Sequence, residues 1–495
     1  MSDRKIIPFQ PPLAQVLPTI EGNVDYRQLR DQLLHIDSLL IRSGIETRLM
    51  EKDLDRWLGR RKQVNAKAQQ TRQLHGRRAL RCNIARLLMA EDFRGFAARL
   101  ADSPLLQHFC GLSQIPCITV PSKSTLQRYE AWWPQQEIRQ TVYQLLGQGA
   151  ATAEKMELPE PVDLESAFLD TTCLAARIHY PIDWVLFRDA TRTLMKAVEL
   201  IRDQGLKHRM EPPQSFLTRM NRLCIQMAQS SRRADSRRQR KRTLRQMDKL
   251  VGVVRHHARR YRALLDQQWE QTQWSRKQAE QVLRRMDQVL DQLPAARQQA
   301  RERILKEQPV ADEDKILSLY EPNVHVIVRG KAGAEVEFGN TLFLAENPQG
   351  LILDWELFKD RAPADAALLP RSVGRMEEAY GPTLKAASAD RGFDSQLNRD
   401  GLEMDGIYNA VCPRSPEQLR ERSRSWKFKR LQQRRAGTEA RISIIKNVFL
   451  RGRGRSKGFT HRELTVAWTV LMHNLWVLAR MPSCAAAPSS LARAA

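Results

Sequence analysis

The feature that most constrains this chain is a long, glycine-poor stretch set between strand-like segments. Residues 182–319 contain only two glycines, are rich in Arg and Gln, and follow a helical pattern. Residues 164–176 before it and 324–330 after it carry the apolar, β-prone pattern of strands. The pattern predicts a sheet that is interrupted, directly after its first strand, by long paired helices.

The segments after this stretch predict a mixed sheet with helices on its faces. Strand patterns at 335–346 and 351–358 flank the turn Asn347-Pro348-Gln349-Gly350, which is a hairpin signal. Further segments alternate along the chain: strands at 384–390 and 406–412, and helices at 363–380, 394–404, 434–450 and 460–479. This order favours the α/β class.

The N-terminal part of the chain is expected to be all-helical. Residues 26–58 carry an apolar stripe, and residues 77–112 read as several short amphipathic helices. In VPSKSTLQRYEAWW (120–133), Ser122 or Ser124 can cap a short helix that presents Lys123 and Arg128. Such a helix is typical of helix-turn-helix DNA binding, and an ordinary helix pair in a bundle is the alternative.

Length and composition exclude several classes of protein. A chain of 495 residues suggests about three domains. Seven cysteines without a C-x-x-C pair argue against a disulfide framework or a zinc site. The longest apolar run, 464–478, is too short to cross a membrane, and the N-terminus lacks a secretory apolar segment. We therefore expect a cytoplasmic protein without a membrane partner.

The excess positive charge is concentrated in two segments. The formal net charge is +25; residues 231–262 hold 13 Lys or Arg against two acids, and residues 414–462 hold 16 against three. Such clustering is typical of phosphate-backbone binding, and solvated helix faces are the alternative. The basic candidates for DNA contact in the first segment are Arg232, Arg233, Arg237, Arg238, Arg240, Lys241 and Arg242.

Three carboxylates stand where this layout would bring them together. Asp170 is on the first strand, Asp390 ends a later strand, and Glu439 lies in a late helix. Neighbouring parallel strands end side by side, and a covering helix can place a third acid above them. Hard divalent cations prefer carboxylate oxygens, and two such ions can assist phosphoryl displacement. By contrast, Asp354 and Asp360 are interpreted as edge or loop groups.

The surroundings of two of these acids add to the hypothesis. Asp390 opens the sequence Asp-Arg-Gly-Phe-Asp-Ser, in which Gly392 permits a tight exit from the strand and Asp394 can cap the next helix. Arg435 and Lys446 lie four residues before and seven residues after Glu439, on the same helical face. An acid flanked by two cations can hold a metal while the cations contact a phosphate chain.

Four stretches carry a resemblance to a known family: RLADSPLLQHFCGL with PSKSTLQ, LDTTCLAARIHYPID (169–183), ADRGFDS (389–395) and RRAGTEARISIIKN (434–447). Here the chain resembles the DDE transposases of bacterial insertion sequences, which implies a ribonuclease-H-like catalytic domain. The resemblance implies that Asp170, Asp390 and Glu439 form the catalytic triad and bind Mg²⁺ or Mn²⁺ as two ions. It also implies binding of terminal inverted repeats, DNA cleavage, joining of the 3′ end to target DNA, and a homodimer in the bacterial nucleoid.

The chain departs from the family pattern at two places. Arg435, Glu439 and Lys446 match the extended signature of some relatives, but Gln432 replaces its tyrosine. The helical insertion at about 182–319 also follows the first strand, whereas those relatives place their insert later. A hydrolysis-only nuclease of the same fold, or a catalytically inactive DNA-binding protein, remains the alternative.

The resulting domain hypothesis has four parts. A helical leader (1–76) precedes a helix-turn-helix-like DNA-binding domain (77–150). The catalytic domain follows at 160–480, interrupted by its insertion, and a disordered tail (481–495) ends the chain.

Overall fold

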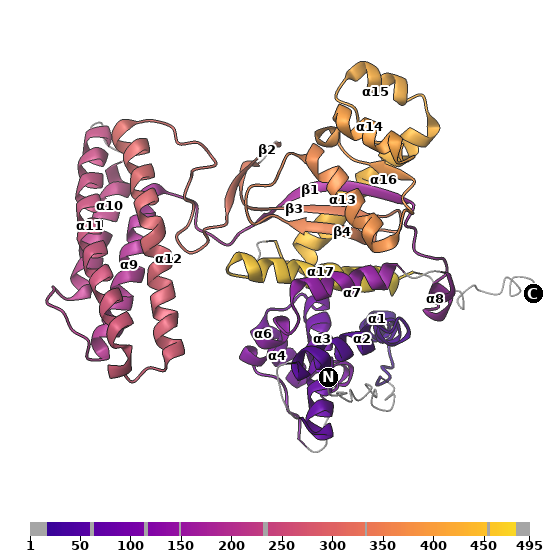
Figure 1. Ribbon diagram of the computed structural model, residues 1–495, viewed down its shortest axis with the longest axis horizontal. Helices are drawn as coiled ribbons and strands as arrows, with labels where there is room; N and C mark the ends of the chain where they lie inside the picture. The colour runs from indigo at the N-terminus through magenta and orange to yellow at the C-terminus, as the bar shows by residue number, and fades with distance from the viewer. Residues whose placement is uncertain are drawn as a thin grey trace, which may run out of the picture.

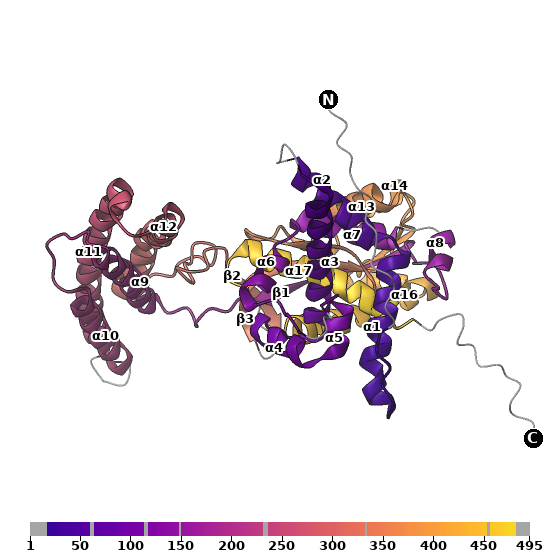
Figure 2. The ribbon, with the colours of Figure 1, turned by 90° about the horizontal axis from the view of Figure 1, so that it is seen from below.

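The computed structural model describes residues 17–59, 64–112, 117–147, 150–230, 236–331, 334–452 and 456–481. Two bodies with separate hydrophobic cores make up this part of the chain (Figure 1). The first core joins the N-terminal helices to the sheet and to the last helix. The second lies inside four helices that stand apart from the sheet in both ribbon views (Figure 2).

The sheet is mixed, as the sequence predicts, and has the strand order β2-β3-β1-β5-β6 with β4 also paired to β3. Its strands are β1 (Ser166–Ala175), β2 (His325–Lys331), β3 (Ala334–Glu346), β4 (Ile352–Leu357), β5 (Ala386–Ser388) and β6 (Tyr408–Asn409). The pairs β1–β5 and β5–β6 are parallel, and the pairs that involve β3 are antiparallel. The α/β class is therefore confirmed.

The hairpin between β3 and β4 is confirmed, whereas two strands are shorter than expected. Gly350 has a φ of +85°, and its N–H donates to the carbonyl of Asn347 at 3.0 Å. The strands predicted at 384–390 and 406–412 shrink to β5 and β6. The backbone N–H of Cys412 nevertheless donates to Ala389 O at 3.0 Å, so both chains stay side by side beyond the regular ladder.

Helices after β4 cover the sheet and shape its ends. They are α13 (Asp365–Tyr380), the short η3 (Arg391–Phe393), α14 (Gln396–Met404), α15 (Pro416–Arg422), α16 (Trp426–Ser443) with its π-helical continuation η4 (Ile444–Phe449), and α17 (Phe459–Leu478). α16 packs on β1 and β5. α17 packs on β4, where the Asn474 side chain exchanges two hydrogen bonds with the backbone of Ile352.

The N-terminal helices pack against the opposite side of α17. They are α1 (Val24–Arg42), α2 (Ile45–Leu58), α3 (Ala66–Leu88), α4 (Phe93–Asp102), α5 (Pro104–Phe109), α6 (Lys123–Glu130), α7 (Gln135–Leu146) and α8 (Ala150–Lys155). Trp468 of α17 donates its indole N–H to the carbonyl of Glu130 at 2.9 Å. α3 runs across the expected boundary at residue 76, because its buried side chains begin at Gln69 and continue to Leu87.

The four-helix bundle between β1 and β2 consists of α9 (Asp183–Asp203), α10 (Pro213–Ser230), α11 (Ser236–Gln268) and α12 (Arg276–Ala300). A short 3₁₀ turn, η1 (Trp269–Gln271), joins the last two, and the π-helical η2 (Arg301–Lys306) ends α12. The helices stop at Lys306, earlier than the predicted residue 319, and Glu307 takes a left-handed φ of +57°. Buried residues of α11 recur every three or four positions, which leaves its cations on the outer face.

Within the described ranges, no helix has the length and apolar character that a membrane crossing needs.

Candidate active site

Strand pairing places Asp170 and Asp390 next to each other. In the parallel β1–β5 pair, Phe168 lies opposite Ser388. Asp170 and Asp390 each follow these partners by two residues, so they lie level with each other, Asp170 in the middle of β1 and Asp390 just past the end of β5. Neighbouring strands lie about 4.8 Å apart, and residues two apart share a face of the sheet. The sheet thus brings together two acids that are 220 positions apart in the sequence.

α16 and its continuation η4 bring further charged groups to the same face. The guanidinium of Arg434 lies 5.0 Å from the ring centre of Phe168, and Lys446 Nζ lies 3.4 Å from Thr172 Oγ1. Because Phe168, Asp170 and Thr172 alternate along β1, these contacts lie on either side of Asp170. Glu439 is exposed on α16 between the two cations.

Asp390 and Glu439 both lie close enough to Asp170 to affect the pKa of its carboxyl. Burial raises the pKa of the Asp170 carboxyl to about 6, and the negative charges of Asp390 and Glu439 add to the rise. The Thr171 N–H, which donates to Oδ1 at 2.7 Å, and the Arg435 guanidinium act in the opposite direction. A carboxylate that is buried beside two other acids is a candidate for cation binding.

The exit of β5 holds Asp390 in a tight turn. Its Oδ1 accepts from the Gly392 N–H at 2.8 Å. A Cβ at position 392 would lie 2.7 Å from Asp365 Oδ2 and 3.1 Å from Asp390 Oδ1. A side chain at this position would therefore require the Asp365 carboxylate to shift, and glycine leaves room for both carboxylates around the turn. The expectation that Asp394 caps the next helix is wrong, because Ser395 is the N-cap of α14. Arg399 Nη2 (2.7 Å) and the Arg414 N–H (2.9 Å) both donate to Asp394 Oδ2, so this acid stabilises the fold.

The carboxylates fit a hard divalent cation in their chemistry and charge. Asp170 and Asp390 each accept a backbone N–H on Oδ1 and make no ion pair among the described residues. A cation would relieve the repulsion that raises the pKa of Asp170. In the part of the chain that the structure describes, no three His, Cys, Asp or Glu side chains already converge on one point. The fit to a divalent cation therefore rests on the charge and chemistry of these carboxylates and not on a preformed cluster of ligands.

Glu346, which the sequence analysis does not single out, anchors α16. Its carboxylate is fully buried at the end of β3. It accepts from Arg434 at 3.0 Å, from Thr438 at 2.8 Å and from Arg441 at 3.1 Å. Because Thr438 precedes Glu439, this anchor fixes the turn of helix that carries the predicted catalytic glutamate. An acid at the end of the apolar run LFLA is the signal that could have revealed it.

Asp354, predicted as an edge or loop group, lies on the edge strand β4, so this prediction is confirmed. Its carboxylate is nevertheless fully buried. Arg139 Nη1 (3.0 Å), Arg375 Nη2 (2.7 Å) and Ser372 Oγ (2.8 Å) donate to its carboxylate. α7 and α13 cover this edge and supply these donors. Asp360 is exposed after the strand.

Gln432, which replaces the tyrosine of the family signature, ties α16 to the strand ends. Its Nε2 donates to the carbonyls of Ala389 and Ala410. Its Oε1 accepts from Arg435 Nε at 3.3 Å. Since Ala389 precedes Asp390, the glutamine amide holds α16 over the exit that carries this acid.

The predicted DNA contacts lie in three separate places. Arg435 and Lys446 are at the active site, and Lys123 and Arg128 are exposed on α6. In the bundle, Arg237, Arg238 and Arg242 are exposed on α11, whereas Arg240 is half-buried and Lys241 pairs with Glu307 at 3.1 Å. Arg232 and Arg233 lie outside the described residues.

Comparison with known proteins identifies one part of the chain. Residues 325–475 match the family model described as a transposase DDE domain. Neither the curated proteins nor the solved structures contain a match to the chain. The matched segment includes Asp390 and Glu439 but begins after Asp170 and the four-helix bundle. Strand pairing therefore supplies the link between Asp170 and the matched segment.

Proposed function

We propose, from the transposase DDE domain that the chain carries, that it is a DDE transposase of a bacterial insertion sequence. In this proposal the mixed sheet is a ribonuclease-H-like catalytic domain, and the helices before it contain a helix-turn-helix-like DNA-binding domain. The enzyme binds terminal inverted repeats, hydrolyses a phosphodiester, and joins the freed 3′ end to target DNA. A homodimer on paired ends belongs to the same proposal.

The observation that supports this function is the grouping of three acids within a basic environment. Asp170 of β1 and Asp390, just past β5, lie level on adjacent parallel chains, and the charge of Glu439 affects Asp170 from α16. Arg435 and Lys446 lie on the same helical segment. Acids hold divalent cations, while arginine and lysine contact the phosphates of the substrate strand.

The proposed roles follow from the chemistry of each side chain. Asp170, Asp390 and Glu439 would hold Mg²⁺ or Mn²⁺, as two ions, which activate water and stabilise the attacking and leaving oxygens. Arg435 is kept beside the acids by Gln432 and would contact a phosphate on the substrate strand. Lys446 carries a flexible point charge and would position the cleaved end.

Neutral, shape-preserving substitutions test the assignment. Asp170→Asn, Asp390→Asn and Glu439→Gln each remove a charged ligand and should abolish Mg²⁺- or Mn²⁺-dependent cleavage of a labelled transposon end. Binding of that end, measured by gel shift in EDTA, should persist. Normal cleavage by these variants would refute the metal-binding role.

A labelled donor end distinguishes the proposed function from its alternatives. A transposase produces joined strand-transfer products with target DNA, whereas a hydrolytic nuclease produces only the cut end. A wild-type protein that binds the ends but never cleaves them would be an inactive DNA-binding protein.

A further inference from the structure

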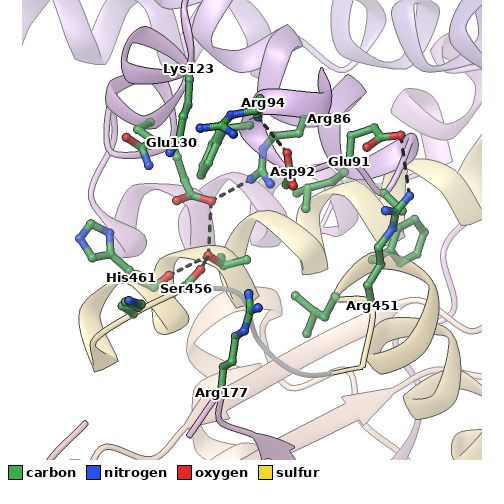
Figure 3. A pocket seen from close by; sticks show the side chains of 18 residues that line it. Arg86, Glu91, Asp92, Arg94, Lys123, Glu130, Arg177, Arg451, Ser456 and His461 are labelled. Carbon is green, nitrogen blue, oxygen red and sulfur yellow. Dashed lines mark hydrogen bonds and ion pairs between the residues drawn. The ribbon is translucent and has the colours of Figure 1, made fainter. Parts of the chain in front are cut away.

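A basic cleft lies between the N-terminal helices and the C-terminal part of the first body (Figure 3). One wall comes from the end of α3, the start of α4 and one face of α6. The other comes from Arg177 beyond β1, residues 449–451 at the end of η4, Ser456 and Lys457, and the start of α17. The cavity encloses about 750 Å³.

The acids of the cleft are already engaged by protein groups. Glu130 is buried and accepts from Arg86 at 2.8 Å and from Thr465 at 3.3 Å. Glu91 lies 3.8 Å from Arg451. Asp92 caps α4 by accepting from the backbone N–H groups of Arg94 and Gly95. These carboxylates therefore offset little of the remaining positive charge.

Four cations on the two walls are left for a ligand. Arg94, Lys123, Arg177 and Lys457 are all exposed. None of the four side chains has an ion pair or hydrogen bond to another described residue. They come from α4, α6, the exit of β1 and the turn before α17, so four separate elements supply the positive charge of the cleft. Cations facing each other across a cleft suit a chain of phosphates.

The cleft lies further along the chain from β1 and η4, the two elements that carry Asp170 and Lys446 of the candidate active site. Arg177 follows Asp170 by seven residues, which is about 20 Å at the rise of a strand. The strand direction is kept beyond β1, because Ala176 N–H donates to Phe338 O at 2.9 Å. On the other wall, Leu450 and Arg451 follow directly after η4, which carries Lys446.

We propose that this cleft binds the phosphate backbone of one DNA strand as it leaves the active site. The inference rests on the proposed function and adds to it a separate site with a preference for single strands. A cavity of 750 Å³ is the size of a small-molecule pocket. A duplex, whose major groove alone is about 12 Å wide, does not enter such a space. A single extended strand does, and its phosphates meet cations on both sides.

This site also changes the role of Lys123. From the sequence, Lys123 and Arg128 are expected on a short helix that is typical of helix-turn-helix DNA binding, with an ordinary helix pair as the alternative. In the structure Lys123 and Gln127 line the cleft, whereas Arg128 does not. Lys123 thus contacts the strand in the cleft, while Arg128 is left for other contacts.

Strand-binding measurements test the site without relying on cleavage. The cleft variant combines Arg94→Gln, Lys123→Gln, Arg177→Gln and Lys457→Gln in the full chain. The probe is a short labelled oligothymidylate in EDTA, compared with a labelled duplex. The variant should bind the single strand at least about tenfold more weakly, and the slope of log K against log salt should fall by about 0.7 for each phosphate that the variant no longer neutralises. Duplex binding, supported by α11, should fall by a smaller factor.

Matched controls make the result decisive. Arg48→Gln with Lys52→Gln removes two exposed cations of α2 outside the cleft and should leave strand binding unchanged. Equal losses in both variants, or equal losses for strand and duplex, would overturn the proposal. Displacement of the strand by equimolar thymidine monophosphate or inorganic phosphate would assign the cleft to a free phosphate ligand instead. A wild type that binds the strand but cleaves no DNA would refute the proposed function and leave this site standing.

Discussion

Buried acids have different partners in two regions of the sheet. On β3 and β4, Glu346 and Asp354 are fully buried and each is surrounded by arginines. In the middle of β1 and just past the end of β5, Asp170 and Asp390 have no ion pair among the described residues, and burial raises the pKa of Asp170 to about 6.

This difference separates acids that hold the fold from acids that are available to a ligand. Breaking the ion pair between a buried carboxylate and its arginine partners is costly, so such a pair stabilises the fold and leaves no free charge for a ligand. A buried carboxylate beside other carboxylates is unfavourable until a cation arrives. The same distinction between paired and unpaired charges applies to the basic residues.

The largest effect is expected from two aspartates that lie four residues apart. Asp390→Asn should lower the rate of DNA cleavage by roughly a thousandfold or more, since it would remove a proposed metal ligand, and should leave the unfolding midpoint near that of the wild type. Asp394→Asn loses the pairing with Arg399 and should lower the unfolding midpoint while the folded protein still cleaves. Cleavage rates and urea denaturation of both variants measure this contrast. Equal cleavage rates and equal unfolding midpoints for the two variants would contradict the difference between an available acid and an acid that holds the fold.

Glu346→Gln should destabilise the fold by about 3–5 kcal/mol, because it leaves Arg434 and Arg441 without their buried partner. Urea denaturation measures the free energy of unfolding. The control is Glu439→Gln, which changes an exposed acid on the same helix and should alter stability by less than about 0.5 kcal/mol. Equal stability of the two variants would argue against the anchoring role.

Asp170→Asn should stabilise the metal-free protein at neutral pH. The pKa of Asp170 is raised from 3.8 to about 6, so the folded state binds its proton more tightly than the unfolded state. The free energy of unfolding of the wild type therefore falls as the pH rises from about 4 to 6. The asparagine variant has no carboxyl to titrate at this position and does not show this fall. The gap should reach about 1–3 kcal/mol above pH 6. Denaturation of both proteins in EDTA across this pH range measures the gap. A difference in the free energy of unfolding that stays constant with pH would contradict the raised pKa.

Lys446 and Glu439 should show separate defects although they share a helical segment. Lys446→Ala should weaken binding of the cleaved end by about tenfold and leave Mn²⁺ affinity near normal, because a protonated amine contacts phosphate and not metal. Glu439→Gln should weaken Mn²⁺ binding and leave end binding near normal. Gel shifts and Mn²⁺ titration of both variants provide the comparison. Matching defects would contradict this division of roles.

The smallest effect is expected on α11, where neighbouring cations differ in their partners. Lys241 pairs with Glu307, and Arg242 is exposed without an ion pair among the described residues. Arg242→Gln should weaken binding to every duplex by a few-fold and lower the salt slope by about one, whereas Lys241→Gln should do less. Fluorescence titrations at several salt concentrations measure both slopes. Loss of binding to the transposon end alone would show that α11 reads sequence.

Local rules explain which parts of the fold could be predicted from the sequence. The hairpin follows from Asn347 and Gly350, since only glycine adopts the turn's positive φ at low cost. The helices of the bundle follow from their apolar periodicity, which each segment carries within itself. The motif around Asp390 could be recognised because its chemistry lies within six consecutive residues.

Interactions between distant residues could not be predicted in the same way. Asp354 and Asp170 both lie on strand patterns, and nothing within those strands distinguishes an anchored acid from an available one. The difference comes from Arg139, which lies 215 residues before Asp354 in the sequence, and from Arg375, 21 residues after it. Gln432 looks like a defect in a motif until its amide meets the carbonyls of Ala389 and Ala410.

Neighbouring residues and composition are enough to predict most of the helices, the hairpin and the location of the basic segments, and the motifs nominate the three acids. The tertiary structure was needed to show that Asp170 lies level with Asp390, that Glu346 anchors α16, and that α4 and α6 lie across a cleft from Arg177. The free energy of a charge depends on its partners and its burial, and folding brings those partners from distant parts of the chain.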